Sequence, residues 1–110
     1  MIKNIIEKGY EDLNNSVDIS KDEDLLTAVN QTLSDLDRGK IRVAEKSDNG
    51  WIVNDWIKKA ILLYFSLTDN SRLPGGISDF YDKVPLKYNN LSEDEAKANK
   101  VRIVPRATAR

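Results

Sequence analysis

Apolar side chains recur at helical spacing in the first part of the chain. Over residues 2–14 they fall on one face of a helix, and over residues 21–38 they do so again. The second segment also carries end signals. Ser20 and Glu23 have the spacing of a capping box, and Gly39 stands where a left-handed C-terminal cap would form. The pattern therefore predicts two consecutive helices separated by a polar break.

An alternating segment follows the second predicted helix. Residues 41–46 alternate between apolar and polar, residues 48–50 read Asp-Asn-Gly, and residues 51–53 are apolar again. Asn and Gly accept the positive φ of a tight turn, so this sequence predicts a β-hairpin. Because a two-stranded hairpin alone is marginal in water, we expect it to lie against the helices.

A third helix is predicted over residues 55–67. Its second half, residues 60–65, is apolar on every side, unlike an ordinary surface helix. We therefore expect this helix to be either the buried centre of the domain or part of a subunit contact.

The remainder of the chain has weaker patterns. Residues 68–78 read as a loop, a second capping box opens a short helix over residues 92–100, and residues 101–105 read as a strand that ends at its proline. The predicted fold class is mainly α with a small β component, made of helices, one hairpin and a short C-terminal strand.

Composition removes several classes of function. The 110 residues include no cysteine and no histidine, so the chain alone holds no thiolate and no imidazole base. The charged N-terminus is not typical of a signal peptide, and the longest apolar run is too short to span a membrane. We expect a cytoplasmic protein that binds no metal and has no membrane partner.

Charge is unevenly distributed along the chain. Residues 1–55 hold 7 basic and 12 acidic side chains, which gives −5, and residues 56–110 hold 10 basic and 6 acidic, which gives +4. Arg102 and Arg106, together with Lys83 and Lys87, are the charges of most interest, because an arginine fork on a strand suits a carboxylate. A solvated basic tail is the alternative. A nucleic-acid partner is not expected, since no recognition pattern accompanies the basic end.

Other candidate sites have ordinary structural explanations. Trp51 and Trp56 could stack on a ligand, but core filling is the favoured interpretation. The Gly75–Gly76 pair lacks any phosphate-binding pattern and reads as a turn. The acidic residues at 79 and 82 and at 93–95 lack the spacing of a cation loop.

Four strings, in the same order and at approximately the same spacing, resemble one enzyme family, the tetrahydrodipicolinate N-succinyltransferases. The strings lie at residues 36–46, 51–63, 81–88 and 101–105. The resemblance implies transfer of a succinyl group from succinyl-CoA to the amino nitrogen of ring-opened tetrahydrodipicolinate, in the diaminopimelate route to lysine. It also implies a homotrimer in which a helical N-terminal domain precedes a left-handed β-helix of hexapeptide repeats.

The chain contains no hexapeptide repeats. The resemblance therefore implies a helical N-terminal domain over residues 1–105 and the start of a linker over residues 106–110. On this interpretation the chain holds no catalytic residue, binds no cofactor by itself and is inactive alone, and succinyl-CoA is a co-substrate of the whole enzyme.

One site residue carries over from the family. Its arginine-valine-valine-proline strand has a dicarboxylate-binding arginine that falls on Arg102 in this sequence. Lys83 and Lys87 match family positions without an assigned role. The alternative function is a stand-alone helical module that contacts a protein partner through its apolar third helix.

Overall fold

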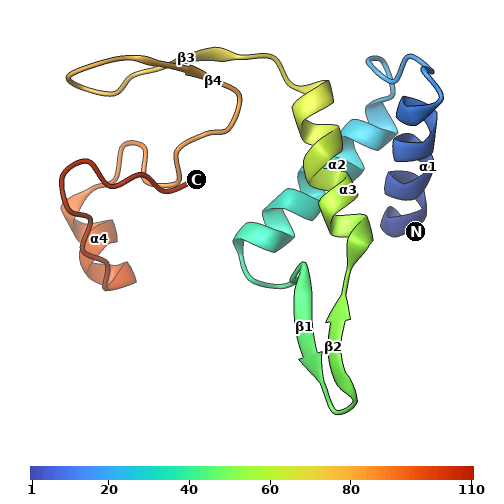
Figure 1. Cartoon of the computed structure of the whole chain (residues 1–110). Helices are drawn as coiled ribbons and strands as arrows, with labels where there is room; N and C mark the ends of the chain where they lie inside the picture. The colour runs from blue at the N-terminus through green and yellow to red at the C-terminus, as the bar shows by residue number, and fades with distance from the viewer. The chain divides into compact units, whose positions relative to one another are not determined.

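The contacts within the chain fall into two units in a computed structural model that describes all residues 1–110 (Figure 1). The first unit is Met1–Asp69 and the second is Asn70–Arg110. The domain boundary expected after residue 105 is not tested by this division and stays a prediction.

Three helices that all contact one another form the N-terminal unit. They are α1 (Ile2–Asn14), α2 (Glu23–Asp37) and α3 (Asp55–Leu67) (Figure 1). The three predicted helices are thus confirmed. The predicted capping of α2 by Ser20 is wrong, because Asp22 is the N-cap and its Oδ1 accepts from the Leu25 N–H at 2.9 Å. The Ser20 N–H instead donates to Asp18 Oδ1 at 2.9 Å.

The core lies where the three helices meet. Ile6 of α1, Leu25 and Val29 of α2 and Leu63 of α3 have no exposed surface. The one buried polar side chain is Thr32, whose hydroxyl donates to the Ala28 carbonyl at 2.8 Å, so its polar group is satisfied within the helix.

Helix α3 is central but not wholly buried. Ile57, Ala60 and Leu63 face the core, while Leu62 and Phe65 are 40% and 44% exposed. The expectation of a buried centre is therefore confirmed for one face only. The apolar residues of the opposite face lie at the surface of the unit.

Two of these helices end in the same motif. At the end of α1 the Ser16 N–H donates to Leu13 and the Val17 N–H to Asp12. At the end of α2 the equivalent bonds join Gly39 to Leu36 and Lys40 to Asp35. Both are Schellman motifs, with φ of +60° at Ser16 and +71° at Gly39. The predicted left-handed cap at Gly39 is confirmed.

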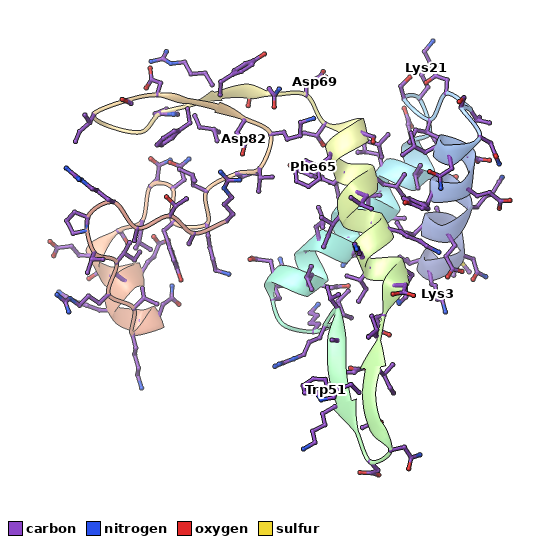
Figure 2. All side chains as sticks on the ribbon, in the orientation of Figure 1. Lys3, Lys21, Trp51, Phe65, Asp69 and Asp82 are labelled. Carbon is purple, nitrogen blue, oxygen red and sulfur yellow. The ribbon has the colours of Figure 1, made fainter.

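The predicted hairpin forms from β1 (Ala44–Ser47) and β2 (Gly50–Val53), which pair antiparallel. Its expected position against the helices is wrong, because neither strand contacts a helix and Trp51 is 72% exposed (Figure 2). Core filling holds only for Trp56, which packs on the core.

The base of this hairpin is fastened by Asn54. Its N–H donates to the Val43 carbonyl at 2.7 Å and its Nδ2 to the Arg42 carbonyl at 2.8 Å. The Asn54 carbonyl in turn accepts from Ile57 at 3.0 Å, in the first turn of α3. One residue therefore closes the hairpin and starts the helix.

The C-terminal unit contains a second hairpin that the sequence pattern did not predict. It pairs β3 (Ser71–Leu73) with β4 (Phe80–Asp82). The Arg72 guanidinium donates from Nε and Nη2 to Asp79 Oδ2 at 2.8 and 2.5 Å. A Cβ at Gly75 would collide with the Ser78 carbonyl oxygen, so only glycine fits at this position of the connecting loop.

The helix α4 (Glu93–Asn99) begins with the predicted capping box. The Ser92 hydroxyl accepts from the Glu95 N–H at 3.1 Å, and the Glu95 carboxylate accepts from the Ser92 N–H at 3.0 Å. The short C-terminal strand predicted over residues 101–105 is wrong. Residues 101–104 are irregular and pair with no strand, and Pro105, which has no N–H to donate, lies in the turn that follows.

The predicted fold class is confirmed in its main terms, since helices dominate and the β component is small. It consists of two separate antiparallel hairpins. None of the helices has the length and apolar character needed to cross a membrane.

Candidate functional site

The segment that carries the predicted site residue follows α4. The helix ends at Lys100, whose φ is +53°, and the Val101 N–H donates back to the Ala96 carbonyl at 3.2 Å. Beyond this cap the chain is irregular as far as Val104. Arg102 therefore lies on an extended stretch held at one end by a helix cap.

A tight turn ends this stretch. The Ala107 N–H donates to the Val104 carbonyl at 3.0 Å, which places Pro105 and Arg106 at the two central positions. The φ of Arg106 is +73°. Proline followed by a positive φ is the arrangement of a type II turn, whose second central residue is usually glycine or asparagine. Arginine is thus an unfavourable choice for the backbone at this position.

The chain after the turn is fastened to the body of the unit. The Lys87 N–H donates to the Ala109 carbonyl at 2.9 Å, and Arg110 Nη1 lies 3.4 Å from Asp82 Oδ2. The buried Asp82 Oδ2 has no other polar partner. These contacts hold residues 106–110 beside the segment that follows β4.

A cleft of about 650 Å³ opens between these segments. Its walls come from three stretches of the C-terminal unit: the β3–β4 loop with the start of β4, residues 86–90, and residues 103–109. Arg106 is the one charged side chain among the lining residues. The other polar side chains are Ser78, Tyr88, Asn89, Asn90 and Thr108.

The structure places Arg102 at the surface, outside the lining of this cleft. Neither Arg102 nor Arg106 is engaged in an ion pair, whereas Arg72 and Arg110 have aspartate partners. Lys83 is half-buried and Lys87 is exposed, and neither lines the cleft. The sequence thus identified the two free arginines of the segment, but the structure brings only Arg106 to a cavity.

The walls of the cleft were missed by sequence reasoning. Phe80 and Tyr88 come from parts of the chain that are distant from Arg106 in the sequence. The hydrogen bond from the Lys87 N–H to the Ala109 carbonyl brings the segment around Tyr88 beside residues 106–110. The one local signal was the order Val104-Pro105, since proline favours the first central position of a turn.

Carboxyl groups take little part in this site. The pKa of Asp18 is lowered by hydrogen bonds from Ser20, and the pKa of Asp35 is lowered by hydrogen bonds from Gln31 and Lys40. Both residues belong to the N-terminal unit. No group of three or more Asp and Glu residues is placed to hold a metal ion.

Comparison with known proteins gives one consistent family. The sequence model described as Tetrahydrodipicolinate N-succinyltransferase N-terminal matches residues 1–67. Proteins named 2,3,4,5-tetrahydropyridine-2,6-dicarboxylate N-succinyltransferase are 45% identical in Alkalilimnicola ehrlichii and 43% identical in Buchnera aphidicola, each over 109 residues. The protein of that name in Ralstonia pickettii is 46% identical over 110 residues.

Each of these alignments covers 99% of the chain but 40% of the relative, so the chain spans about two fifths of the length of the proteins that it matches. The matched part includes both units of the structure. The chain belongs to the tetrahydrodipicolinate N-succinyltransferase family and corresponds to its N-terminal domain.

Proposed function

We propose that the chain serves as the substrate-binding N-terminal part of a tetrahydrodipicolinate N-succinyltransferase. The observation that carries this proposal is the match of 41–46% identity along nearly the whole chain. The reaction joins the succinyl group of succinyl-CoA to the amino nitrogen of ring-opened tetrahydrodipicolinate, a step in making diaminopimelate and lysine. The whole enzyme works as a homotrimer in the cytoplasm.

In this proposal the residues of this chain bind and position the amino substrate. The groups that handle the thioester belong to the part of the relatives that this chain does not cover. The nucleophile is the nitrogen of the substrate itself, so the reaction needs no cysteine or histidine from this domain. Succinyl-CoA is a co-substrate, and the chain alone is inactive.

Arg102 grips one carboxylate of the amino substrate. A guanidinium presents two parallel N–H donors that match a carboxylate. Its exposure and its lack of an ion-pair partner support this role, because the fork is free for a ligand. Fixing the dicarboxylate turns its amine toward the thioester, and such positioning can lower a two-substrate barrier substantially.

The test uses the complete polypeptide that contains this chain, with Arg102→Ala and Arg102→Lys compared in steady-state kinetics. Loss of a charge-assisted pair should raise KM for the amino substrate by roughly 10- to 150-fold in the alanine variant, with KM for succinyl-CoA little changed. Lysine should restore part of the loss, since it keeps the charge without the fork. Lys97→Ala on α4 is the matched control and should behave like the parent.

Equal losses for both substrates in Arg102→Ala would contradict the assigned role. The division of labour has a separate test, in which acyl transfer by the complete polypeptide is compared with that of the 110-residue chain. Turnover is expected only from the complete polypeptide. Consumption of succinyl-CoA by the 110-residue chain would overturn the proposal.

A further inference from the structure

The cleft of the C-terminal unit has a distinct electrostatic character. Its lining contains one arginine and neither aspartate nor glutamate. The aspartates nearest in sequence to its walls are engaged elsewhere, since Asp79 is paired with Arg72 and Asp82 with Arg110. The cation of Arg106 is therefore not neutralised by any carboxylate of the unit, and an anion entering the cleft meets a single positive group.

The remaining walls suit the body of an organic molecule. Phe80 and Tyr88 contribute aromatic rings, and Leu86 and Ile103 contribute aliphatic surface. Phe80 is 48% exposed and Ile103 is 40% exposed, so apolar surface is available for a ligand to cover. The volume of about 650 Å³ is in the usual range for small-molecule sites, which combine apolar walls with a few polar groups.

The backbone at Arg106 supplies an independent observation. Its φ of +73° lies in the left-handed region, which disfavours a residue with a Cβ. The fold itself makes no use of the side chain, because the guanidinium has no hydrogen bond or ion pair in the structure. An arginine that has a strained backbone conformation and no structural partner for its side chain points to a role in ligand binding.

We propose that this cleft binds a small organic anion, with its carboxylate on Arg106 and its flat or apolar body against Phe80 and Tyr88. The site is distinct from the one assigned to Arg102, which does not line the cleft. It therefore goes beyond the proposed function. Two ligands would have this chemistry. One is the cyclic dicarboxylate substrate of the proposed function, and the other is a different carboxylic acid that binds beside it.

The test titrates the isotope-labelled 110-residue chain in metal-free buffer and follows its backbone amides by NMR. The probes are benzoate, pyridine-2,6-dicarboxylate and its neutral analogue pyridine-2,6-dicarboxamide. The two anions should shift the amides of Gly75, Asn89 and Ala107, which line the cleft. The neutral analogue and inorganic sulfate should bind at least about tenfold more weakly, because each lacks one of the two required features.

Three variants locate the anion contact. Arg106→Gln should weaken benzoate binding by about tenfold or more, whereas Lys97→Gln removes the same charge from α4 and should leave binding unchanged. Arg106→Gly should also lose binding but should raise the thermal unfolding midpoint of the chain, because glycine adopts the positive φ of this turn without strain. Loss of binding with a gain in stability excludes misfolding as the cause.

The two sources are separated by the affinities of the two anions. Tighter binding of pyridine-2,6-dicarboxylate than of benzoate identifies the cleft as a place for the cyclic dicarboxylate, and equal affinities identify a site for carboxylic acids in general. Equal binding of the neutral analogue, or unchanged affinity in Arg106→Gln, would overturn the proposal. Neither result would bear on Arg102, so the proposed function can fail or stand separately.

Discussion

Gly9 of α1 lies against Leu25 of α2 so closely that a Cβ at position 9 would be 2.6 Å from Leu25 Cδ2 and would also overlap Cδ1. Leu25 has no exposed surface and cannot rotate away without displacing its neighbours. This pair sets how closely the two helices approach. Glycine within a helix normally weakens it, so its presence here reflects packing rather than helix propensity.

Gly9→Ala should therefore destabilise the chain. The helix gains about 0.5–1 kcal/mol from alanine, but forcing a methyl group into the core costs about 1–3 kcal/mol. We expect a net loss of about 1–2 kcal/mol in the free energy of unfolding, measured by urea denaturation. In the Leu25→Ala background the obstruction is gone, and Gly9→Ala should then be neutral or stabilising. A stabilising effect in the parent background would show that α1 and α2 do not pack as described.

The Schellman motifs at the ends of α1 and α2 predict opposite effects of opposite substitutions. Ser16 and Gly39 occupy the same left-handed position, but serine has a Cβ. Ser16→Gly should stabilise the chain by about 0.5–1 kcal/mol, and Gly39→Ala should destabilise it by about 1 kcal/mol. Thermal unfolding of both variants beside the parent measures this. A gain from Gly39→Ala would contradict the motif at the end of α2.

Asp35 predicts a pH dependence of stability. Hydrogen bonds from Gln31 and from Lys40, whose Nζ lies 3.2 Å from Asp35 Oδ1, lower its pKa. The ionised carboxylate therefore favours the folded state, and its contribution is present above the ordinary aspartate pKa of about 3.9. That contribution is lost as the pH falls from this value through the lowered pKa of the folded state.

The variant Asp35→Asn checks this sign. The difference in unfolding free energy between parent and variant should be constant near neutral pH and should shrink as the pH falls below about 3.9. Denaturation curves at a series of pH values measure it. A difference that grows toward acid pH would show that the ionised carboxylate of Asp35 disfavours the folded state.

The tryptophans should respond differently to truncation. Trp51 is 72% exposed on the free hairpin, and Trp56 packs on the core of the three helices. Trp51→Ala should change the unfolding free energy by less than about 0.5 kcal/mol, and Trp56→Ala should cost about 2 kcal/mol or more. Acrylamide should quench Trp51 fluorescence more strongly. Similar quenching of both would mean that something covers the hairpin.

The two Ser-x-x-Glu sequences can be told apart by alanine substitution. Ser92 caps α4, which has no buried residue and so depends strongly on its cap. Ser92→Ala should destabilise α4 by about 1 kcal/mol, seen as smaller helical chemical shifts over residues 93–99. Ser20→Ala should leave α2 intact, since Asp22 is its cap. A loss of α2 helicity in Ser20→Ala would contradict this and would show that Ser20 does cap α2.

Elements with strong local signals could be predicted from the sequence. The apolar period predicted the three long helices, and the Asp-Asn-Gly sequence of residues 48–50 predicted the first hairpin, whose two loop residues are Asp48 and Asn49. The second hairpin was missed because its strands are only three residues long, too short to show a clear alternation of apolar and polar residues. The start of α2 was misassigned because Ser20 and Asp22 are both good caps, and Asp18 engages the Ser20 N–H.

Exposure and the site itself needed long-range information. Whether Trp51 packs on the helices depends on where the hairpin points, which no local pattern encodes. Arg102 and Arg106 could be identified by their charge, but the cleft beside Arg106 arises from the return of the chain to Lys87. The comparisons support the family resemblance read from the sequence and give no support to a stand-alone interaction module.

Asn54 couples the first hairpin to helix α3 in the N-terminal unit. Because the same residue bonds to the segment before β1 and to the first turn of α3, the base of the hairpin and the start of the helix share one set of hydrogen bonds. Movement of the hairpin relative to α3 would therefore have to distort these hydrogen bonds of Asn54. A ligand or partner that bound the tip of the hairpin would therefore be linked to the first turn of α3 through Asn54.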